Sequence, residues 1–261
     1  MTVAAPVRPD VTASTGSTGS TPLRVGVVVF PGSNCDRDAG NAWAEGNYGE
    51  TVYLWHNDTD LQGVDAVLVP GGFSYGDALR AGAIARLAPM MASVLRFAQN
   101  GGLVAGVCNG FQILCEAGLL PGALVRNENL RFVCRQVYLR VENVNTPFTA
   151  RYAPGEVLSI PIAHGEGRYV CDDETYTHLQ AENRVLFRYV SREGQTTREA
   201  NPNGSRDNIA GIVGGPKNNI LGMMPHPERA VRAALGSGDG ARLFDSLAHT
   251  LTALRAGKTV F

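Results

Sequence analysis

The segment Gly106-Val107-Cys108-Asn109-Gly110 places a thiol between two glycines, after an apolar run and before a helix-like stretch. A nucleophile on such a strand-to-helix turn projects from the carboxyl edge of a sheet, as in the G-x-S-x-G elbow with sulfur in place of oxygen. The helix N-terminus stabilises a thiolate, and the backbone N–H of Asn109 can hold an oxyanion. These features predict that Cys108 is a nucleophile, against the alternative of a buried structural cysteine between turn glycines.

A thiol nucleophile needs a base, because a free cysteine of pKa about 8.5 is mostly protonated at neutral pH. His226 lies in Pro225-His226-Pro227-Glu228, and the prolines indicate an extended chain in which residues two apart point the same way. Glu228 is then expected to orient His226 toward Cys108, which gives a triad in the chain order Cys, His, Glu. The alternative is a surface turn with a solvated histidine and glutamate.

A second oxyanion donor is expected in Pro70-Gly71-Gly72-Phe73, which follows the apolar run 66–70. Glycines at the carboxyl end of a strand let backbone N–H groups approach a ligand. A plain tight turn explains this segment equally well.

Apolar runs of strand length alternate with helix-like segments in the first half, which predicts an α/β fold with a mostly parallel sheet flanked by helices. The expected strands there are 24–30, 51–55, 66–70 and 103–108, and the expected helices are 35–45, 89–102 and 110–117. The second half has strand character without comparable helices, which predicts an antiparallel addition that returns to the main sheet near residue 220. The expected strands are 131–143, 155–164, 184–190, 208–214 and 218–224, followed by a closing helix over 241–254. Residues 1–22 read as a flexible tail and 23–261 as a single domain.

The composition limits the classes of partner and the compartment. The chain has 261 residues, 44% of them hydrophobic, and a formal net charge of −1. A near-neutral chain has no global attraction to nucleic acid or to an anionic membrane, so neither is an expected partner. The odd count of five cysteines without a C-x-x-C pair, and the lack of an 18-residue apolar run, indicate a reduced, cytoplasmic protein. The four cysteines other than Cys108 are expected to be buried structural residues.

At this point the chain resembles the class I glutamine amidotransferases, and within them the glutaminase subunits of phosphoribosylformylglycinamidine synthase. The resemblance covers residues 24 to 250. It rests on VVVFPGSNCDRD (27–38), LVPGGFSYGD (68–77), GVCNGFQIL (106–114), CRQVYLRVEN (134–143), IPIAHGEGRY (160–169), NPNGS (201–205) and MMPHPERA (223–230).

The resemblance implies a flavodoxin-like α/β fold and a role for each matched residue. Cys108 is the nucleophile, His226 the base and Glu228 its orienter. The amides of Gly72 and Asn109 form the oxyanion hole. Gln112, four residues after Cys108, helps to bind the substrate glutamine.

The implied reaction is hydrolysis of L-glutamine to glutamate through a Cys108 thioester, with the ammonia passed to a synthetase. ATP and magnesium are expected on that large synthetase subunit, which makes formylglycinamidine ribonucleotide in purine biosynthesis, and a small accessory subunit is expected beside it. No cofactor and no metal are expected in this chain. Gly257-Lys258-Thr259 resembles the end of a phosphate loop but lacks the required earlier glycine.

Two other functions are compatible with some of the same residues. His164-Gly165-Glu166 and His226-Pro227-Glu228 both match the H-x-E of zinc deaminases, but no P-C-x-x-C follows. The roles of His164 and Glu166 stay open between a subunit contact and a contribution to pocket shape. A non-enzymatic module that uses Cys108 only for redox sensing would carry the same fold.

Overall fold

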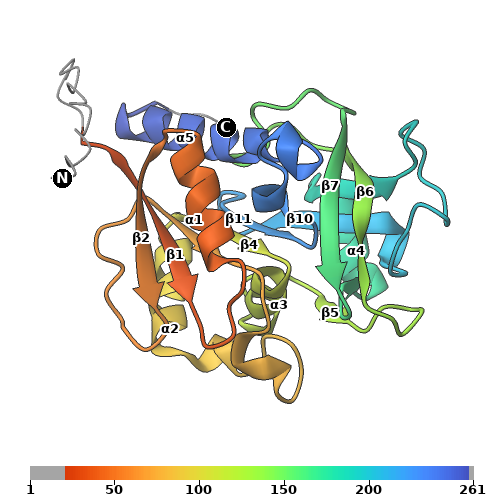
Figure 1. The fold of residues 1–261 in the computed structure, drawn as a ribbon, viewed down its shortest axis with the longest axis horizontal. Helices are drawn as coiled ribbons and strands as arrows, with labels where there is room; N and C mark the ends of the chain where they lie inside the picture. Colours follow the sequence, from red (N-terminus) through yellow and green to blue (C-terminus); the bar gives the residue numbers. More distant parts are fainter. Residues whose placement is uncertain (1–20, 259–261) are drawn as a thin grey trace, which may run out of the picture.

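The computed structural model describes residues 21–258, and these residues form a nine-stranded mixed sheet with helices on both faces (Figure 1). The strand order is β2-β1-β3-β4-β11-β10-β9-β6-β7. The strands are β1 (Leu23–Val29), β2 (Gly49–Trp55), β3 (Ala66–Val69), β4 (Leu103–Val107), β6 (Val133–Val141), β7 (Val157–His164), β9 (Val185–Val190), β10 (Ile209–Gly214) and β11 (Ile220–Met223). The larger helices are α1 (Asp36–Glu45), α2 (Pro89–Gln99), α3 (Asn109–Glu116), α4 (Asp173–Ala181) and α5 (Ala241–Arg255).

The sheet divides into a parallel part and an antiparallel part. Strands β2, β1, β3, β4 and β11 pair in parallel with one another. From β11 onward, the successive pairs with β10, β9, β6 and β7 are antiparallel. The predicted α/β fold with an antiparallel addition is therefore confirmed. So is the return of the chain to the main sheet near residue 220, because β11 pairs directly with β4.

Two hydrophobic cores, one on each face, hold the layers together. Val25 and Val27 of β1 face the core that contains residues of α1 and α5, whereas Val28 faces the core that contains residues of α2, α3 and α4. In Figure 1, α1 lies in front of β1 and β2, and α2 lies behind them. Strands covered on both faces explain why the runs in the first half are apolar at every position rather than at alternate ones.

Helix α4 interrupts the half in which only strands were predicted. Asp172 caps it, with its carboxylate accepting a 2.8 Å hydrogen bond from the amide of Thr175, and Leu179 is its buried residue. A helix that buries so little has no apolar stripe, so no helical period of hydrophobic residues marks this segment. Two short strands were also not predicted: β5 (Ala123–Val125) and β8 (Arg168–Val170), which pair with each other.

The expectation of buried structural cysteines was wrong for Cys134, which is exposed on β6, while Cys115 and Cys171 are partly buried. The predicted tail lies outside the described residues apart from Thr21 and Pro22. Within residues 21–258 no helix has both the length and the apolar character to cross a membrane.

Candidate active site

The carboxyl ends of the parallel strands bring the predicted site residues together. Strands β1, β3, β4 and β11 end at the same edge of the sheet, because neighbours in a parallel sheet point the same way. The segments that follow them are 30–35, 70–73, 108–110 and 224–228. All the sequence motifs with proposed chemistry therefore meet at one edge of the sheet, at the position where open α/β sheets bind ligands.

Cys108 adopts the conformation expected of a nucleophile elbow. Its φ is +51° and its ψ −106°, a backbone state that costs a non-glycine residue roughly 1–3 kcal/mol. The flanking glycines allow this turn: a Cβ on Gly106 would lie 2.7 Å from the backbone of Gly110, and one on Gly110 would lie 1.8 Å from the carbonyl oxygen of Val69. The surrounding fold therefore holds Cys108 in a strained turn that only glycines at these two positions permit.

His226 and Glu228 form a buried pair. The Nδ1 of His226 lies 2.6 Å from Oε1 of Glu228, and both side chains are 2% exposed. The extended chain predicted for this segment is wrong, because Pro227–Arg229 is a turn of 3-10 helix. Proline is accepted at the first position of a helical turn, where its missing N–H costs no hydrogen bond. The helical turn of the backbone thus brings the two side chains together. They do not point the same way from an extended strand.

The surroundings of the His226 imidazole shift its pKa in opposite directions. Burial alone would lower its pKa, but the Glu228 carboxylate and the neighbouring thiols of Cys108 and Cys35 hold the pKa well above its usual value. Its Nε2 is buried without a hydrogen-bond partner. A Cβ on Gly71 would lie 2.8 Å from Cε1 of His226 and 3.4 Å from Cβ of Cys108. The nucleophile and the imidazole therefore flank the same glycine, with an unused ring nitrogen available for proton transfer.

The peptide between Gly71 and Gly72 is oriented by the loop before α1. The Gly71 carbonyl accepts hydrogen bonds from the amides of Asn34 and Cys35, at 3.4 and 3.2 Å. In a trans peptide the next N–H points the opposite way, so the amide of Gly72 faces away from that loop. Gly72 lines the cavity that contains Cys108. Asn109 begins α3, and its amide has no acceptor within the helix. Both predicted oxyanion donors are therefore free amides beside the nucleophile.

Gln112 lines the same cavity, but both ends of its amide are occupied by the protein. Its Nε2 donates a 2.6 Å hydrogen bond to the carbonyl of Glu166, and its Oε1 accepts one of 2.9 Å from Nδ2 of Asn109. These bonds tie the loop after β7 to the helix that carries Cys108. Gln112 is thus a positioning residue for that loop, and its predicted contact with glutamine stays a prediction.

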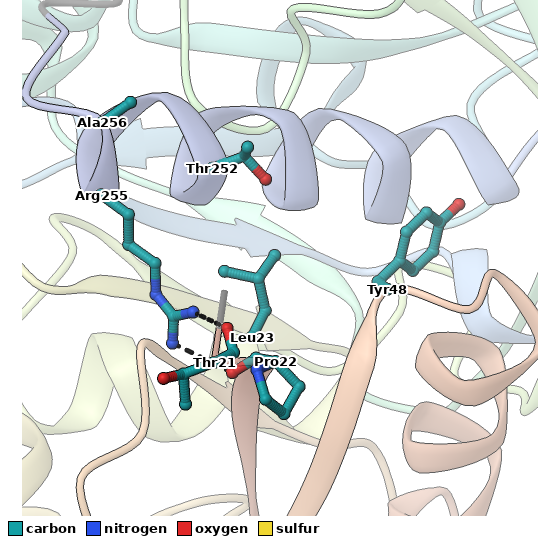
Figure 2. Close-up of a pocket in the computed structure, with 7 residues that line it drawn as sticks. All are labelled: Thr21, Pro22, Leu23, Tyr48, Thr252, Arg255 and Ala256. Atoms are coloured by element: carbon teal, nitrogen blue, oxygen red, sulfur yellow. Dashed lines mark hydrogen bonds between the residues drawn. The ribbon is translucent and has the colours of Figure 1, made fainter. Parts of the chain in front are cut away.

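The cavity has a volume of about 180 Å³ and opens beside Cys108. A larger hollow of about 490 Å³ lies around Arg255 and Tyr48, where Arg255 donates to the carbonyls of Thr21 and Pro22 (Figure 2). That hollow borders the first residue of β1, at the edge of the sheet opposite to Cys108. The smaller cavity is the candidate active site, because Cys108 and Gly72, one of the two predicted oxyanion donors, line it.

His164, left without a role by the sequence, is 2% exposed and lines the cavity. Its Nδ1 lies 3.1 Å from Oδ1 of Asn127, and its Nε2 lies 3.5 Å from Nδ2 of Asn203. Burial, together with the positive charge of the nearby His226, lowers its pKa to about 4. A neutral imidazole fixed by two asparagines shapes the pocket rather than transferring protons at neutral pH.

Cys35 is a further neighbour of the predicted triad, and its sequence motif did not predict that position. Its Sγ accepts a 3.1 Å hydrogen bond from Arg229, whose Nε donates a 3.0 Å bond to Asp38. The signal was its place at the end of the loop between β1 and α1, at the same edge of the sheet as Cys108. Among residues 21–258, Cys35, His226 and Glu228 are the group whose ligand atoms lie close enough to hold a metal, within 4.8 Å of one another. The guanidinium on the sulfur disfavours a cation there, and the His226–Glu228 bond favours acid–base chemistry.

Comparison with known proteins identifies the family to which the chain belongs. Residues 22–239 match the CobB/CobQ-like glutamine amidotransferase domain. The phosphoribosylformylglycinamidine synthase subunit PurQ of Salinibacter ruber is 54% identical over 233 residues, which span 89% of this chain and 99% of the relative. The subunit of the same name from Koribacter versatilis is 55% identical over 227 residues, which span 86% of this chain and 97% of the relative.

Solved structures agree with these matches. The structure of PurLQS from Thermotoga maritima has a chain 44% identical to this one, with a TM-score of 0.78, and the match covers 88% of this chain and 100% of that one. The glutaminase domain of a CTPS from Trypanosoma brucei, at 13% identity and a TM-score of 0.56, shares the fold over 92% of this chain and 96% of its own. The chain therefore belongs to the glutamine amidotransferases, and within them to the PurQ family of phosphoribosylformylglycinamidine synthase subunits.

Proposed function

We propose that this chain hydrolyses L-glutamine through a Cys108 thioester and delivers the ammonia to a synthetase subunit. The observation that carries the proposal is the strained turn at Cys108, next to an imidazole whose far nitrogen is bound to a buried carboxylate. Nucleophile, base and orienter are the parts that acyl transfer requires.

The first half-reaction forms the thioester. The Cys108 sulfur attacks the side-chain carboxamide carbon of glutamine, and the developing oxyanion is held by the amides of Gly72 and Asn109. His226 passes a proton to the leaving nitrogen, the C–N bond breaks, and ammonia departs. Glu228 stabilises the charged imidazole in the orientation that this transfer needs.

The second half-reaction releases glutamate. A water molecule attacks the thioester carbonyl while His226 accepts its proton, and the C–S bond breaks to regenerate Cys108. The net reaction consumes one water and one glutamine and yields one glutamate and one ammonia. ATP and magnesium, and the ribonucleotide that accepts the ammonia, are assigned to the large synthetase subunit, with a small accessory subunit in the same complex.

The proposal is tested by measuring glutamate release from glutamine, with and without the synthetase subunit and its substrates. We expect low activity from this chain alone and a large increase on adding the partner, because hydrolysis without an acceptor would waste ammonia. An electrophilic glutamine analogue should label Cys108, and Cys108→Ser should abolish turnover. Cys134→Ser is the matched control, since Cys134 is exposed on β6. Activity retained in Cys108→Ser would remove the catalytic assignment.

A further inference from the structure

Three residues other than glycine have strained backbone conformations in the loop that follows β3. Tyr75, Asp77 and Leu79 have φ values of +53°, +52° and +69°, in the left-handed region that favours glycine. Such conformations persist only where the surrounding structure holds them. The contacts of this loop therefore decide whether it keeps its shape.

The inner part of this loop connects to both predicted oxyanion donors. The amide of Ser74 donates a 3.1 Å hydrogen bond to Oδ1 of Asn109, the residue whose own amide is one of these donors. The amide of Phe73, which directly follows Gly72, donates a 2.9 Å bond to the carbonyl of Gly32. A shift of the loop would therefore disturb both amides that are expected to hold the oxyanion.

The outer part of the loop is anchored through the side chain of Tyr75. Its hydroxyl lies 2.6 Å from Nδ1 of His56, and the two rings meet edge to face with their centroids 5.5 Å apart. His56 directly follows β2, and its backbone is bonded at both ends. Its amide donates to the carbonyl of Val29, and its carbonyl accepts from the amide of Met90 in α2, each at 3.0 Å. His56 is thus a fixed support, and Tyr75 fastens the strained loop to it, together with a 2.7 Å bond from the Tyr75 amide to the carbonyl of Pro31.

We propose that the contact between Tyr75 and His56 positions the two oxyanion donors, which makes this pair positioning residues of the glutaminase reaction. Neither side chain is among the described residues that line the cavity beside Cys108. The pair therefore acts through the loop and does not touch glutamine. This inference rests on the proposed glutaminase function and adds to it the residues that set its oxyanion hole.

The first test is Tyr75→Phe in the complex with the synthetase subunit, because this change removes the hydroxyl and keeps the ring. It should lower kcat for glutamine hydrolysis about 10- to 100-fold, since misplaced donors stabilise the oxyanion less. KM should stay within about 3-fold, because the affected interaction is made in the transition state. Tyr176→Phe is the matched control: it removes a 2.6 Å hydrogen bond to Asp207 on α4 and should leave kcat unchanged. Wild-type kcat in Tyr75→Phe would overturn the proposal.

Variants of His56 test the same contact from its other side. His56→Asn places an amide that can donate or accept near the position of Nδ1, and it should keep kcat within about 3-fold of wild type. His56→Phe keeps a ring without a polar atom and should match the loss in Tyr75→Phe. The double variant of Tyr75→Phe and His56→Phe should lose no more than either single variant, because both changes remove one interaction. Additive losses would show that the two side chains do not act as a pair.

An aldehyde analogue of glutamine separates an effect on the oxyanion donors from general damage to the site. The sulfur of Cys108 adds to the aldehyde carbon of L-glutamate γ-semialdehyde, and the carbonyl oxygen then takes the place of the oxyanion. Its affinity should fall about 10- to 100-fold in Tyr75→Phe, whereas the affinity of Cys108→Ser for glutamine should change less than about 2-fold when Tyr75→Phe is added. Unchanged affinity for the aldehyde, or equal weakening for both ligands, would overturn the proposal. Wild-type complex that binds the aldehyde but releases no glutamate from glutamine would instead remove the proposed function.

Discussion

The amide of Cys35 donates a 3.2 Å hydrogen bond to the carbonyl of Gly71, so the start of α1 holds the peptide that carries the Gly72 amide. Cys35 is also a neighbour of the His226 imidazole. One loop, 31–35, thus fixes the peptide that carries the predicted oxyanion donor and lies beside the predicted base. The active site depends on this contact between loops that follow different strands.

Gly71→Ala should abolish most of the activity while leaving the fold intact. The new methyl group would lie 2.8 Å from Cε1 of His226 and 3.0 Å from Sγ of Cys35, so the imidazole must move. A displacement of this size costs on the order of 10²-fold in kcat. Gly76→Ala, in the same loop, is the control: its φ of +66° adds backbone strain, but nothing lies within 4 Å of the added carbon. Steady-state kinetics decide the point, and wild-type kcat in Gly71→Ala would contradict it.

Glu228→Gln should lower kcat by on the order of 10²- to 10⁴-fold, because an amide can no longer stabilise the charged His226 or fix its tautomer. The same change should slow alkylation of Cys108 near neutral pH, since the imidazolium that favours the thiolate is lost. Rates of alkylation from pH 5 to pH 9 measure this effect directly. Unchanged kinetics and an unchanged alkylation profile would mean that the 2.6 Å contact is structural.

The stability of the protein should fall in acid because of His164. Its pKa is near 6.5 when the chain is unfolded and about 4 in the folded state, so the unfolded chain binds the proton first as the pH falls. The free energy of unfolding should therefore decrease by up to about 3 kcal/mol between pH 6.5 and pH 4. Asp77, whose pKa is raised to about 6, acts in the opposite direction.

Urea unfolding of wild type and His164→Asn across this pH range isolates the His164 contribution, because Asp77 is common to both proteins. The variant should lose stability less steeply with falling pH. Parallel curves for the two proteins would show that His164 does not titrate in this way.

Gly110→Ala should destabilise the fold by about 3 kcal/mol or more, because the added carbon would overlap the carbonyl of Val69 at 1.8 Å. Gly118→Ala serves as the control. Its φ is +70° but nothing lies within 4 Å, so only the backbone strain of about 1–2 kcal/mol applies. Thermal and urea unfolding measure both, and equal losses in the two variants would refute the packing explanation of the elbow.

Local patterns in the sequence were enough to predict the strands of the main sheet, the elbow and the identity of the chemical groups. Runs such as Leu103–Val107 are buried on both faces of a sheet and so show their burial in every residue. Gly106 and Gly110 are needed because β4 and α3 pack closely around Cys108. Since these elements are adjacent in the chain, the local sequence reveals this constraint. Helix α4 was not predicted, because its largely polar residues show no hydrophobic period.

The tertiary structure alone decided which distant groups meet. Cys108 and His226 are more than a hundred positions apart, and their approach follows from the pairing of β4 with β11. The 3-10 turn at Pro227–Arg229 and the position of Cys35 beside the imidazole also depend on that packing. Such contacts arise from the register and the shared edge of strands remote in sequence, which no local spacing of residues encodes.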